Sequence, residues 1–229
     1  MGTLYIVATP IGNLEDITLR ALRILKEVDV IACEDTRHTL RLLNHYEIEK
    51  KLIATHAHNE KNSALGIVKL LDEGLNVAFV SDAGTPTISD PGSILVSLVR
   101  KEGFDVVPIP GVSATTTLMS VAGLTGKTFT FEGFLPLKGQ KRRNRLETLL
   151  KREEAFILYE SPFRIVKLLE EIATIAPRRN VVIGREMTKI YEEFLEGKSG
   201  QLLAILSERP NIKGEFALCV APFDEVDSP

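Results

Sequence analysis

Two carboxylates and an arginine stand close together in the segment ACEDTRHT, directly after a short apolar run. Glu34 and Asp35 could orient or deprotonate a hydroxyl group, and Arg37 could bind a phosphate. The same segment could instead close a strand with an ion pair, in which Asp35 or Thr36 is the N-cap of the next helix. The residue types favour a catalytic or phosphate-binding role over helix capping only slightly.

A second distinctive segment, LPLKGQKRRNR, concentrates positive charge in a chain whose net charge is −3. Its cations are Lys138, Lys141, Arg142, Arg143 and Arg145. Such clusters bind nucleic acids because neutralising phosphates releases counterions. A solvated helix start would also explain the charges, but Gly139 favours a mobile loop that grips an RNA backbone. Few aromatic residues accompany the cluster, so we expect shape recognition and no base-stacking platform.

Charged residues also follow apolar runs in the second half of the chain. In GREMTK, Arg185, Glu186 and Lys189 could approach a catalytic centre, and Lys189 would act there if burial lowered its pKa. In YESPFR, Glu160 and Arg164 flank a turn. Either group could equally form a salt bridge between domains.

The histidines and cysteines give no sign of a metal or disulfide centre. His56 and His58 lack cysteine or carboxylate partners at ligand spacing, so the sequence predicts no metal site. Cys33 and Cys219 lie far apart and form no CxxC pair. We interpret both as core residues of a protein in a reduced, cytoplasmic setting.

The composition is that of an ordinary globular protein, with 44% hydrophobic and 26% charged residues. A length of 229 residues permits one large or two small domains. No apolar run approaches the roughly 20 residues that span a bilayer, and no secretory leader is recognisable. We therefore expect no membrane partner.

Apolar runs alternate with helical patterns in the first half, which predicts a mostly parallel sheet with helices on both faces. The expected strands are 3–8, 28–34, 51–56, 76–82 and 104–110, and the expected helices are 17–27, 36–46, 60–73 and 92–102. This pattern defines an N-terminal α/β domain, residues 1–121.

The pattern changes near Gly123 and Gly126, where strands follow one another with shorter connections. The expected strands are 128–134, 155–161, 180–186, 192–197 and 215–221, with helices at 144–153, 164–176 and 200–208. We therefore expect a C-terminal α/β domain, 122–229, with a mixed sheet, a basic RNA-contacting loop and a frayed tail at 224–229.

Three loops fall at the carboxyl ends of first-domain strands, where open parallel sheets bind ligands. They are Pro10-Ile11-Gly12, residues 81–92 and residues 110–114. None matches a dinucleotide fingerprint or a phosphate loop, and Pro10 removes a backbone donor. Any one loop could be a simple tight turn. Three at one edge favour a site for a flat, partly apolar ligand that carries an adenine and a cation.

The chain resembles the small-subunit ribosomal RNA cytidine-2′-O-methyltransferase family, a branch of the tetrapyrrole methylase superfamily. The motifs that carry this resemblance are TPIGN, CEDTR, SDAGTPTISDPG, IPGVSA, GFLP.KG..R, YESPFR and GREMTK. Each motif is weak alone, but together they extend along nearly the whole chain.

The resemblance implies an S-adenosylmethionine-dependent enzyme, a cofactor cleft between two α/β domains, and a homodimer. It implies 2′-O-methylation of a cytidine in the decoding region of 16S ribosomal RNA, and no DNA partner. By position, the superfamily's first-domain cofactor contacts correspond to Pro10, Ile11, Gly12, Ala83, Gly84, Thr85, Ile88, Ser113 and Ala114. A looser correspondence gives Tyr159, Met187 and Ala217 in the second domain.

Two rival functions remain open. A tetrapyrrole-type small-molecule methyltransferase would need no basic segment, and the superfamily patterns GxGPGD and GDP are here replaced by ATPIGN and AGTP. A non-catalytic ribosome-assembly factor would need the basic segment but none of the three loops. Binding of S-adenosylmethionine distinguishes the assembly factor from either enzyme.

Overall fold

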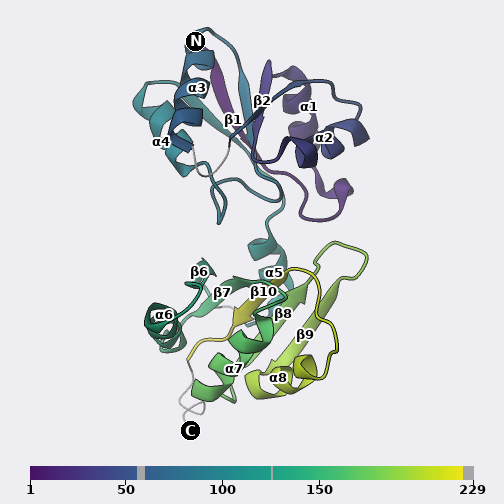
Figure 1. The fold of residues 1–229 in the computed structure, drawn as a ribbon, viewed down its shortest axis with the longest axis vertical. Helices are drawn as coiled ribbons and strands as arrows, with labels where there is room; N and C mark the ends of the chain where they lie inside the picture. Colours follow the sequence, from purple (N-terminus) through teal and green to yellow (C-terminus); the bar gives the residue numbers. More distant parts are fainter. Residues whose placement is uncertain (56–59, 125, 224–229) are drawn as a thin grey trace. The chain divides into compact units, whose positions relative to one another are not determined.

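The chain folds into two compact units, Met1–Ser113 and Ala114–Pro229, in a computed structural model that describes residues 1–55, 60–124 and 126–223 (Figure 1). The division lies earlier than the expected 121/122 boundary, because α5 (Ala114–Ala122) packs on strands of the second unit. His56, His58 and the expected tail at 224–229 lie outside the described residues.

Unit 1 contains a parallel five-stranded sheet in the order β3-β2-β4-β1-β5. Its strands are β1 (Thr3–Val7), β2 (Val30–Cys33), β3 (Lys51–Ala54), β4 (Val77–Val80) and β5 (Asp105–Ile109). Every residue of β2 and β4 is buried, as expected for strands that helices cover on both faces. The predicted parallel sheet is confirmed.

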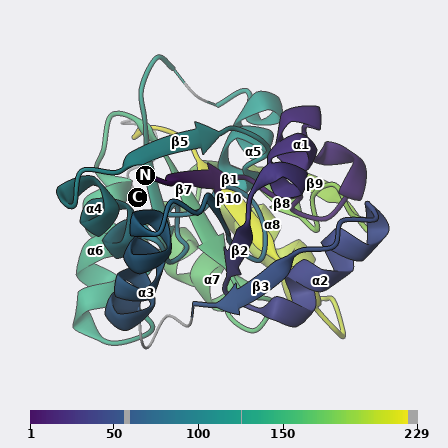
Figure 2. The ribbon, with the colours of Figure 1, turned by 90° about the horizontal axis from the view of Figure 1, so that it is seen from above.

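Helices cover both faces of this sheet (Figure 2). The helical elements of unit 1 are the 3₁₀ turn η1 (Leu14–Asp16), α1 (Leu19–Glu27), α2 (Thr36–His45), α3 (Glu60–Asp72) and α4 (Ser93–Lys101). Ile24, Leu25 and Leu43 form one core on the α1 and α2 face. Ile67 and Leu95 belong to a second core on the α3 and α4 face. The two cores fix the direction of the sheet, and therefore of its loops.

Unit 2 contains a mixed five-stranded sheet in the order β6-β7-β10-β8-β9. Its strands are β6 (Phe129–Phe134), β7 (Ala155–Glu160), β8 (Asn180–Arg185), β9 (Glu193–Lys198) and β10 (Phe216–Val220). β6 and β7 are parallel, whereas β10 runs antiparallel to both β7 and β8, and β9 antiparallel to β8. The predicted mixed sheet is confirmed.

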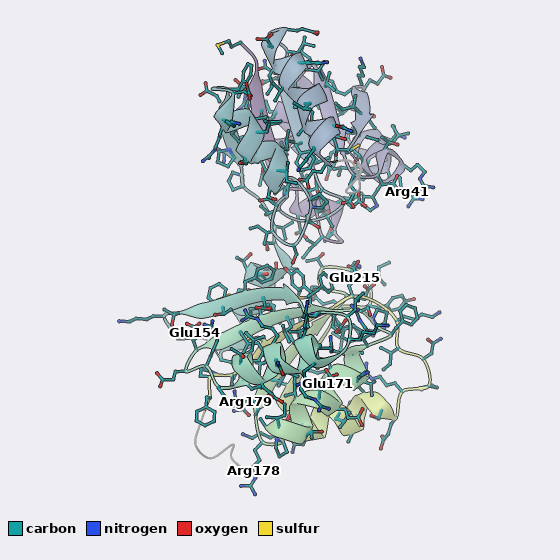
Figure 3. All side chains as sticks on the ribbon, turned by 60° about the vertical axis from the view of Figure 1, so that its left-hand side comes forward. Arg41, Glu154, Glu171, Arg178, Arg179 and Glu215 are labelled. Atoms are coloured by element: carbon teal, nitrogen blue, oxygen red, sulfur yellow. The ribbon has the colours of Figure 1, made fainter. Side chains whose placement is uncertain are left out.

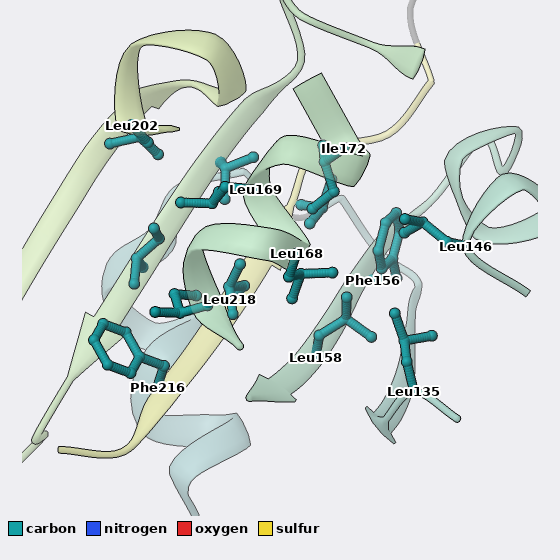
Figure 4. Packing of buried hydrophobic residues seen from close by; sticks show 14 of the residues in the cluster. Leu135, Leu146, Phe156, Leu158, Leu168, Leu169, Ile172, Leu202, Phe216 and Leu218 are labelled. Carbon is teal, nitrogen blue, oxygen red and sulfur yellow. The ribbon is translucent and has the colours of Figure 1, made fainter. Parts of the chain in front are cut away.

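The helices of unit 2 are divided unequally between the sheet faces. α6 (Gln140–Leu150), α7 (Ile165–Ile175) and α8 (Ser199–Ser207) lie on the face opposite α5 (Figure 1). The side chains of Phe156, Leu158, Leu168, Ile172 and Leu218 pack together beneath them (Figure 4). This hydrophobic core stabilises unit 2, because burying each such side chain contributes about 1.5–3 kcal/mol.

A bulge in β6 turns aromatic side chains toward the α5 face. The register with β7 shifts between Phe131 and Gly133, so Phe131 and Phe134 share one face. Both rings pack edge-on against Tyr159, with centroid distances of 5.2 and 5.8 Å. The Tyr159 hydroxyl lies 2.7 Å from Oγ1 of Thr115 in α5. α5 is thereby fastened to the sheet of unit 2.

Buried charges connect the helices of unit 2 to its loops. Arg179 is fully buried and donates hydrogen bonds to the carbonyls of Leu150 (3.0 Å) and Ala221 (3.1 Å) (Figure 3). Arg142 is also buried, with its guanidinium 3.3 Å from Glu160 and 2.8 Å from Glu171. Because buried ions lose hydration, removing one partner leaves an expensive unpaired charge.

Glu160→Ala should therefore lower the free energy of unfolding by about 3–5 kcal/mol, because it leaves Arg142 with less charge compensation. Urea unfolding followed by circular dichroism measures this change. The double variant Arg142→Met, Glu160→Leu should recover most of the loss. Arg23→Ala, which breaks an exposed pair with Glu27, should cost less than about 1 kcal/mol. Equal losses for Glu160→Ala and Arg23→Ala would contradict the expectation.

Candidate functional site

The parallel sheet of unit 1 brings three loops into direct contact at its carboxyl edge. Thr9 and Gly84 exchange two backbone hydrogen bonds of 2.9 Å, which join the loop after β1 to the loop after β4. Oγ1 of Thr85 donates to the carbonyl of Val112 at 3.2 Å, which joins the loop after β4 to the loop after β5. The convergence predicted from the sequence is therefore present in unit 1.

Small residues allow these loops to approach so closely. Gly84 has a left-handed φ of +78°, and a Cβ there would lie 3.4 Å from Cγ2 of Ile11. At Gly111 a Cβ would lie only 2.9 Å from Cβ of Ala8. The loops therefore form a narrow cradle of backbone and apolar surface.

The structure collects most of the predicted cofactor contacts in this cradle. Those in the joined loops of unit 1 are Pro10, Ile11, Gly12, Ala83, Gly84, Thr85, Ile88 and Ser113. Ala114, by contrast, is the first residue of α5 in unit 2. Their role as ligand contacts stays a prediction.

The long loop after β4 is held in an unusual backbone conformation. Thr87 and Ser89 have left-handed φ values of 72° and 66°, which cost free energy for residues with a Cβ. Oε1 of Glu60 accepts the backbone N–H groups of Gly92 (2.9 Å) and Ile94 (3.3 Å). Glu60 therefore caps α4 from another helix, since Gly92 has no side chain with which to do so.

Unit 2 brings together the three further residues that the resemblance implied. Ala217 in β10 stands opposite Tyr159 in β7 and opposite Gly184 in β8. Met187 covers Gly184 so closely that a Cβ there would lie 2.5 Å from the methionine sulfur. Tyr159, Met187 and Ala217 therefore lie together on the α5 face of the sheet, where Met187 and Ala217 are buried, and Gly184 leaves the space that Met187 fills.

Asp35 is the N-cap of α2, as one of the two interpretations expected. Its carboxylate accepts the backbone N–H of Arg37 at 2.8 Å and pairs with the Arg37 guanidinium at 2.8 Å. These hydrogen bonds hold the pKa of Asp35 well below its usual range. A carboxylate with so low a pKa is a weak base, so Asp35 is a poor candidate for proton abstraction. Arg37 keeps its side chain 87% exposed.

Asp90 is the carboxylate that the sequence analysis missed. It lies half-buried in the loop after β4. Burial raises its pKa to about 6, a hydrogen bond with Ser81 partly opposes this rise, and the charges of Glu34 and Asp82 add to it. A pKa near 6 suits a general base at neutral pH. The presence of Asp82 and Asp90 in one loop was the signal available in the sequence.

The condition under which Lys189 would act as a base, a lowered pKa, is not met. Burial would lower its pKa, but hydrogen bonds to Glu186 (2.8 Å) and Glu215 (2.9 Å) outweigh burial and raise it. Lys189 therefore stays charged and is no base. Lys189 and Arg164 both form their ion pairs within unit 2, so the pairs considered as links between domains are internal to one unit.

The basic segment is a helix start, not the expected mobile loop, because α6 begins at Gln140. Arg142 faces inward and pairs with Glu160 and Glu171, so the prediction that it contacts RNA was wrong. Arg145 forms a two-point pair with Glu132. The exposed cations of the segment are Lys138, Lys141 and Arg143.

Neither a metal centre nor a membrane span is found in the part of the chain that the structure describes. No group of His, Cys, Asp or Glu side chains there could hold a metal ion, and no helix there is long and apolar enough to cross a bilayer. Cys33 and Cys219 are both buried, as predicted. Burial raises the pKa of Cys219 to about 11, so its thiol is unreactive at neutral pH.

Comparison with solved structures supports the fold. The chain aligns with diphthine synthase at a TM-score of 0.75 and 15% identity, covering 96% of this chain and 90% of that one. It aligns with uroporphyrin-III C-methyltransferase from Thermus thermophilus, in complex with S-adenosylhomocysteine, at a TM-score of 0.67 and 18% identity, covering 95% and 97%. At these identities the likeness shows the architecture alone.

Comparison of sequences identifies the family. Residues 3–203 match the family described as Tetrapyrrole (Corrin/Porphyrin) Methylases. A protein of Borrelia garinii subsp. bavariensis named ribosomal RNA small subunit methyltransferase I is 51% identical, over 95% of this chain and 98% of its own. Proteins of that name from Escherichia coli O157:H7 and Bacillus subtilis are 49% and 46% identical, over 96% of this chain and 77% and 75% of theirs. The chain belongs to the ribosomal RNA small subunit methyltransferase I family, within the tetrapyrrole methylases.

Proposed function

We propose that this methyltransferase transfers a methyl group from S-adenosylmethionine to the ribose 2′-oxygen of a cytidine in the decoding region of 16S ribosomal RNA. The observation that carries the proposal is the similarity of nearly the whole chain to proteins named for methylation of small-subunit ribosomal RNA. The position of the methyl group on a cytidine 2′-oxygen rests on the family resemblance of the sequence motifs.

The loop cradle of unit 1 fits the methyl donor of this family. Ile11 and Ile88 offer apolar surface for an adenine, and the backbone N–H groups of Ala83 and Thr85, on either side of the paired Gly84, offer hydrogen bonds to a methionine tail. When bound, S-adenosylmethionine supplies a methyl group on a sulfonium sulfur, which is already a good leaving group. The protein is then left with the tasks of aligning the acceptor oxygen and removing its proton.

Asp90 is the best candidate to receive the proton of the 2′-hydroxyl. Its pKa of about 6 leaves the carboxylate mostly ionised at pH 7, yet more basic than an ordinary aspartate. Glu34 stands near enough to influence its charge, and we assign Glu34 the orientation of the hydroxyl. A general base contributes about 10²–10⁴-fold in rate, and alignment of the reacting groups supplies much of the remainder.

Exposed cations provide the contacts to RNA phosphates. In unit 2 these are Lys138, Lys141 and Arg143, and in unit 1 Arg37 is the candidate. Arg142 instead holds the helix start in place. The family resemblance further supports a homodimer, and a ribosomal substrate would place the enzyme in the cytoplasm.

Methyl transfer from labelled S-adenosylmethionine tests the proposed function directly. Unmodified small ribosomal subunits, free ribosomal RNA and a tetrapyrrole precursor are offered side by side, and labelled RNA is digested to locate the methyl group. We expect label on a cytidine 2′-oxygen in subunits, in free RNA or in both. Label in the tetrapyrrole alone would favour the small-molecule rival. Failure to bind the cofactor in calorimetry would favour a non-catalytic assembly factor.

Asp90→Asn should lower the single-turnover rate at saturating substrate by about 10²-fold or more, because asparagine cannot accept the proton. The wild-type rate should rise as pH increases through about 6, where Asp90 ionises, and then level off. The variant should lack this rise. Asp72→Asn changes an exposed carboxylate at the end of α3 and should match the wild type. An unchanged pH profile in Asp90→Asn would mean that another group accepts the proton of the 2′-hydroxyl.

Lys141→Gln and Arg143→Gln should weaken RNA binding mainly at low salt. Each lost phosphate contact should reduce the slope of log affinity against log salt concentration by about 0.7 for single-stranded RNA. Filter binding over a range of salt concentrations measures the slope. Lys151→Gln, at the exposed far end of α6, is the matched control. Equal slopes in all variants would contradict the proposal that Lys141 and Arg143 contact RNA phosphates.

A further inference from the structure

Two large apolar side chains stand almost fully in solvent beside the exposed cations of unit 2. Leu137 follows β6 and is 75% exposed, and Phe163 follows β7 and is 93% exposed. β6 and β7 are parallel neighbours with Phe134 opposite Tyr159, so both turns leave the same edge of the sheet. Single exposed apolar residues are common, so their surroundings must decide whether the pair has a function.

One buried carboxylate ties both turns to the helix behind them. Glu160 accepts the backbone N–H of Ser161 at 2.9 Å and Nε of Arg164 at 2.7 Å, which fixes the turn that carries Phe163. Arg142 donates to Glu160 and also, at 3.3 Å, to the carbonyl of Pro136 in the turn that carries Leu137. Buried ion pairs contribute little net stability, so the result of this network is defined turn geometry.

Exposed cations lie near these turns in the sequence. Lys138 is adjacent to Leu137, and Arg143 is exposed in the first turn of α6, whereas Arg164, adjacent to Phe163, is paired with Glu160. An aromatic ring with nearby cations is how proteins bind single-stranded nucleic acid, because every base has a face to stack. A second copy of this chain fits less well, since a two-fold contact would place the same cations against each other.

The groove beside these turns limits where an RNA strand can run. It lies between α6 and α7, and Lys138, Arg143 and Lys167 line it together with Glu147, Glu170 and Glu171. These carboxylates repel phosphates. RNA is therefore expected at the first turn of α6, which carries Lys141 and Arg143 and no carboxylate.

We propose that Phe163, with Leu137 on the neighbouring turn, stacks on an unpaired base of the RNA substrate, and that Glu160 is the positioning residue for this contact. The inference rests on the proposed function and deepens it by naming a base-stacking surface. No base-stacking surface was expected beside the basic segment, because few aromatic residues accompany it in the sequence. Phe163 comes from the next motif, and only the pairing of β6 with β7 brings the two together.

The test compares Phe163→Ala with Phe163→Tyr, which keeps an aromatic ring. With saturating S-adenosylmethionine and unmethylated small subunits, Phe163→Ala should raise KM by between about fivefold and 100-fold and leave kcat within about twofold. Phe163→Tyr should stay near the wild-type KM. Leu19→Ala removes a side chain in α1 that is 86% exposed and is the control for loss of exposed apolar surface.

The role of Glu160 is measured through Phe163. Glu160→Gln should raise KM in the wild-type background but add little to Phe163→Ala, because both changes remove the same contact. A merely structural role would give additive effects in the double variant. Additive effects would therefore contradict the proposal that Glu160 acts by positioning Phe163.

Binding of a fluorescent, unstructured RNA oligonucleotide provides a readout that needs no methyl transfer. Weaker binding by Phe163→Ala and restored binding by Phe163→Tyr support stacking even if the wild type methylates no RNA, which would be a failure of the proposed function alone. Wild-type binding by Phe163→Ala overturns the inference. So does a change in elution volume for Phe163→Ala in size-exclusion chromatography, because Phe163 would then lie in a subunit contact.

Discussion

The parallel pairing of β1 with β4 and β5 is the constraint on which the cradle of unit 1 depends. Parallel neighbours end at the same edge of a sheet, so three loops distant in sequence begin within hydrogen-bonding range of one another. The paired backbone of Thr9 and Gly84 then closes the cradle, and small residues at Gly84 and Gly111 are required because side chains would separate the loops. Glu60 fixes the far end of the longest loop from a helix outside the cradle.

Similar side chains acquire different properties at this edge because their neighbours differ. Asp35 accepts hydrogen bonds from the guanidinium and the backbone N–H of Arg37, which lower its pKa and make it a poor base. Asp90 is half-buried near two other carboxylates, which raises its pKa and makes it a better base. In unit 2, Arg142 and Arg143 are adjacent in sequence but have opposite environments. Successive helical positions point about 100° apart, so Arg142 enters the core and Arg143 meets solvent.

Much of the fold followed from the sequence, since apolar periodicity predicted the strands, both sheet types and most helices. The side-chain environments did not follow. The local sequence does not distinguish Arg142 from its neighbours, because only the packing of α6 on α7 buries it. Gly139 suggested a loop, although a helix begins directly after it. The raised pKa of Asp90 depends first on its burial and then on nearby charges, among them Glu34, which follows β2. The proximity of the turns that carry Leu137 and Phe163 depends on strand pairing. Properties that arise from long-range contacts cannot be predicted from the residues adjacent in the sequence.

The place of β10 in its sheet affects how the protein is made. Unit 1 is continuous in sequence, so it can fold while the rest of the chain is still being synthesised. Unit 2 cannot complete its sheet so early, because Phe216–Val220 must insert between β7 and β8. A chain interrupted before these residues would expose two unpaired strand edges and invite aggregation or proteolysis. The central strand thus makes proper folding of unit 2 conditional on translation through Val220.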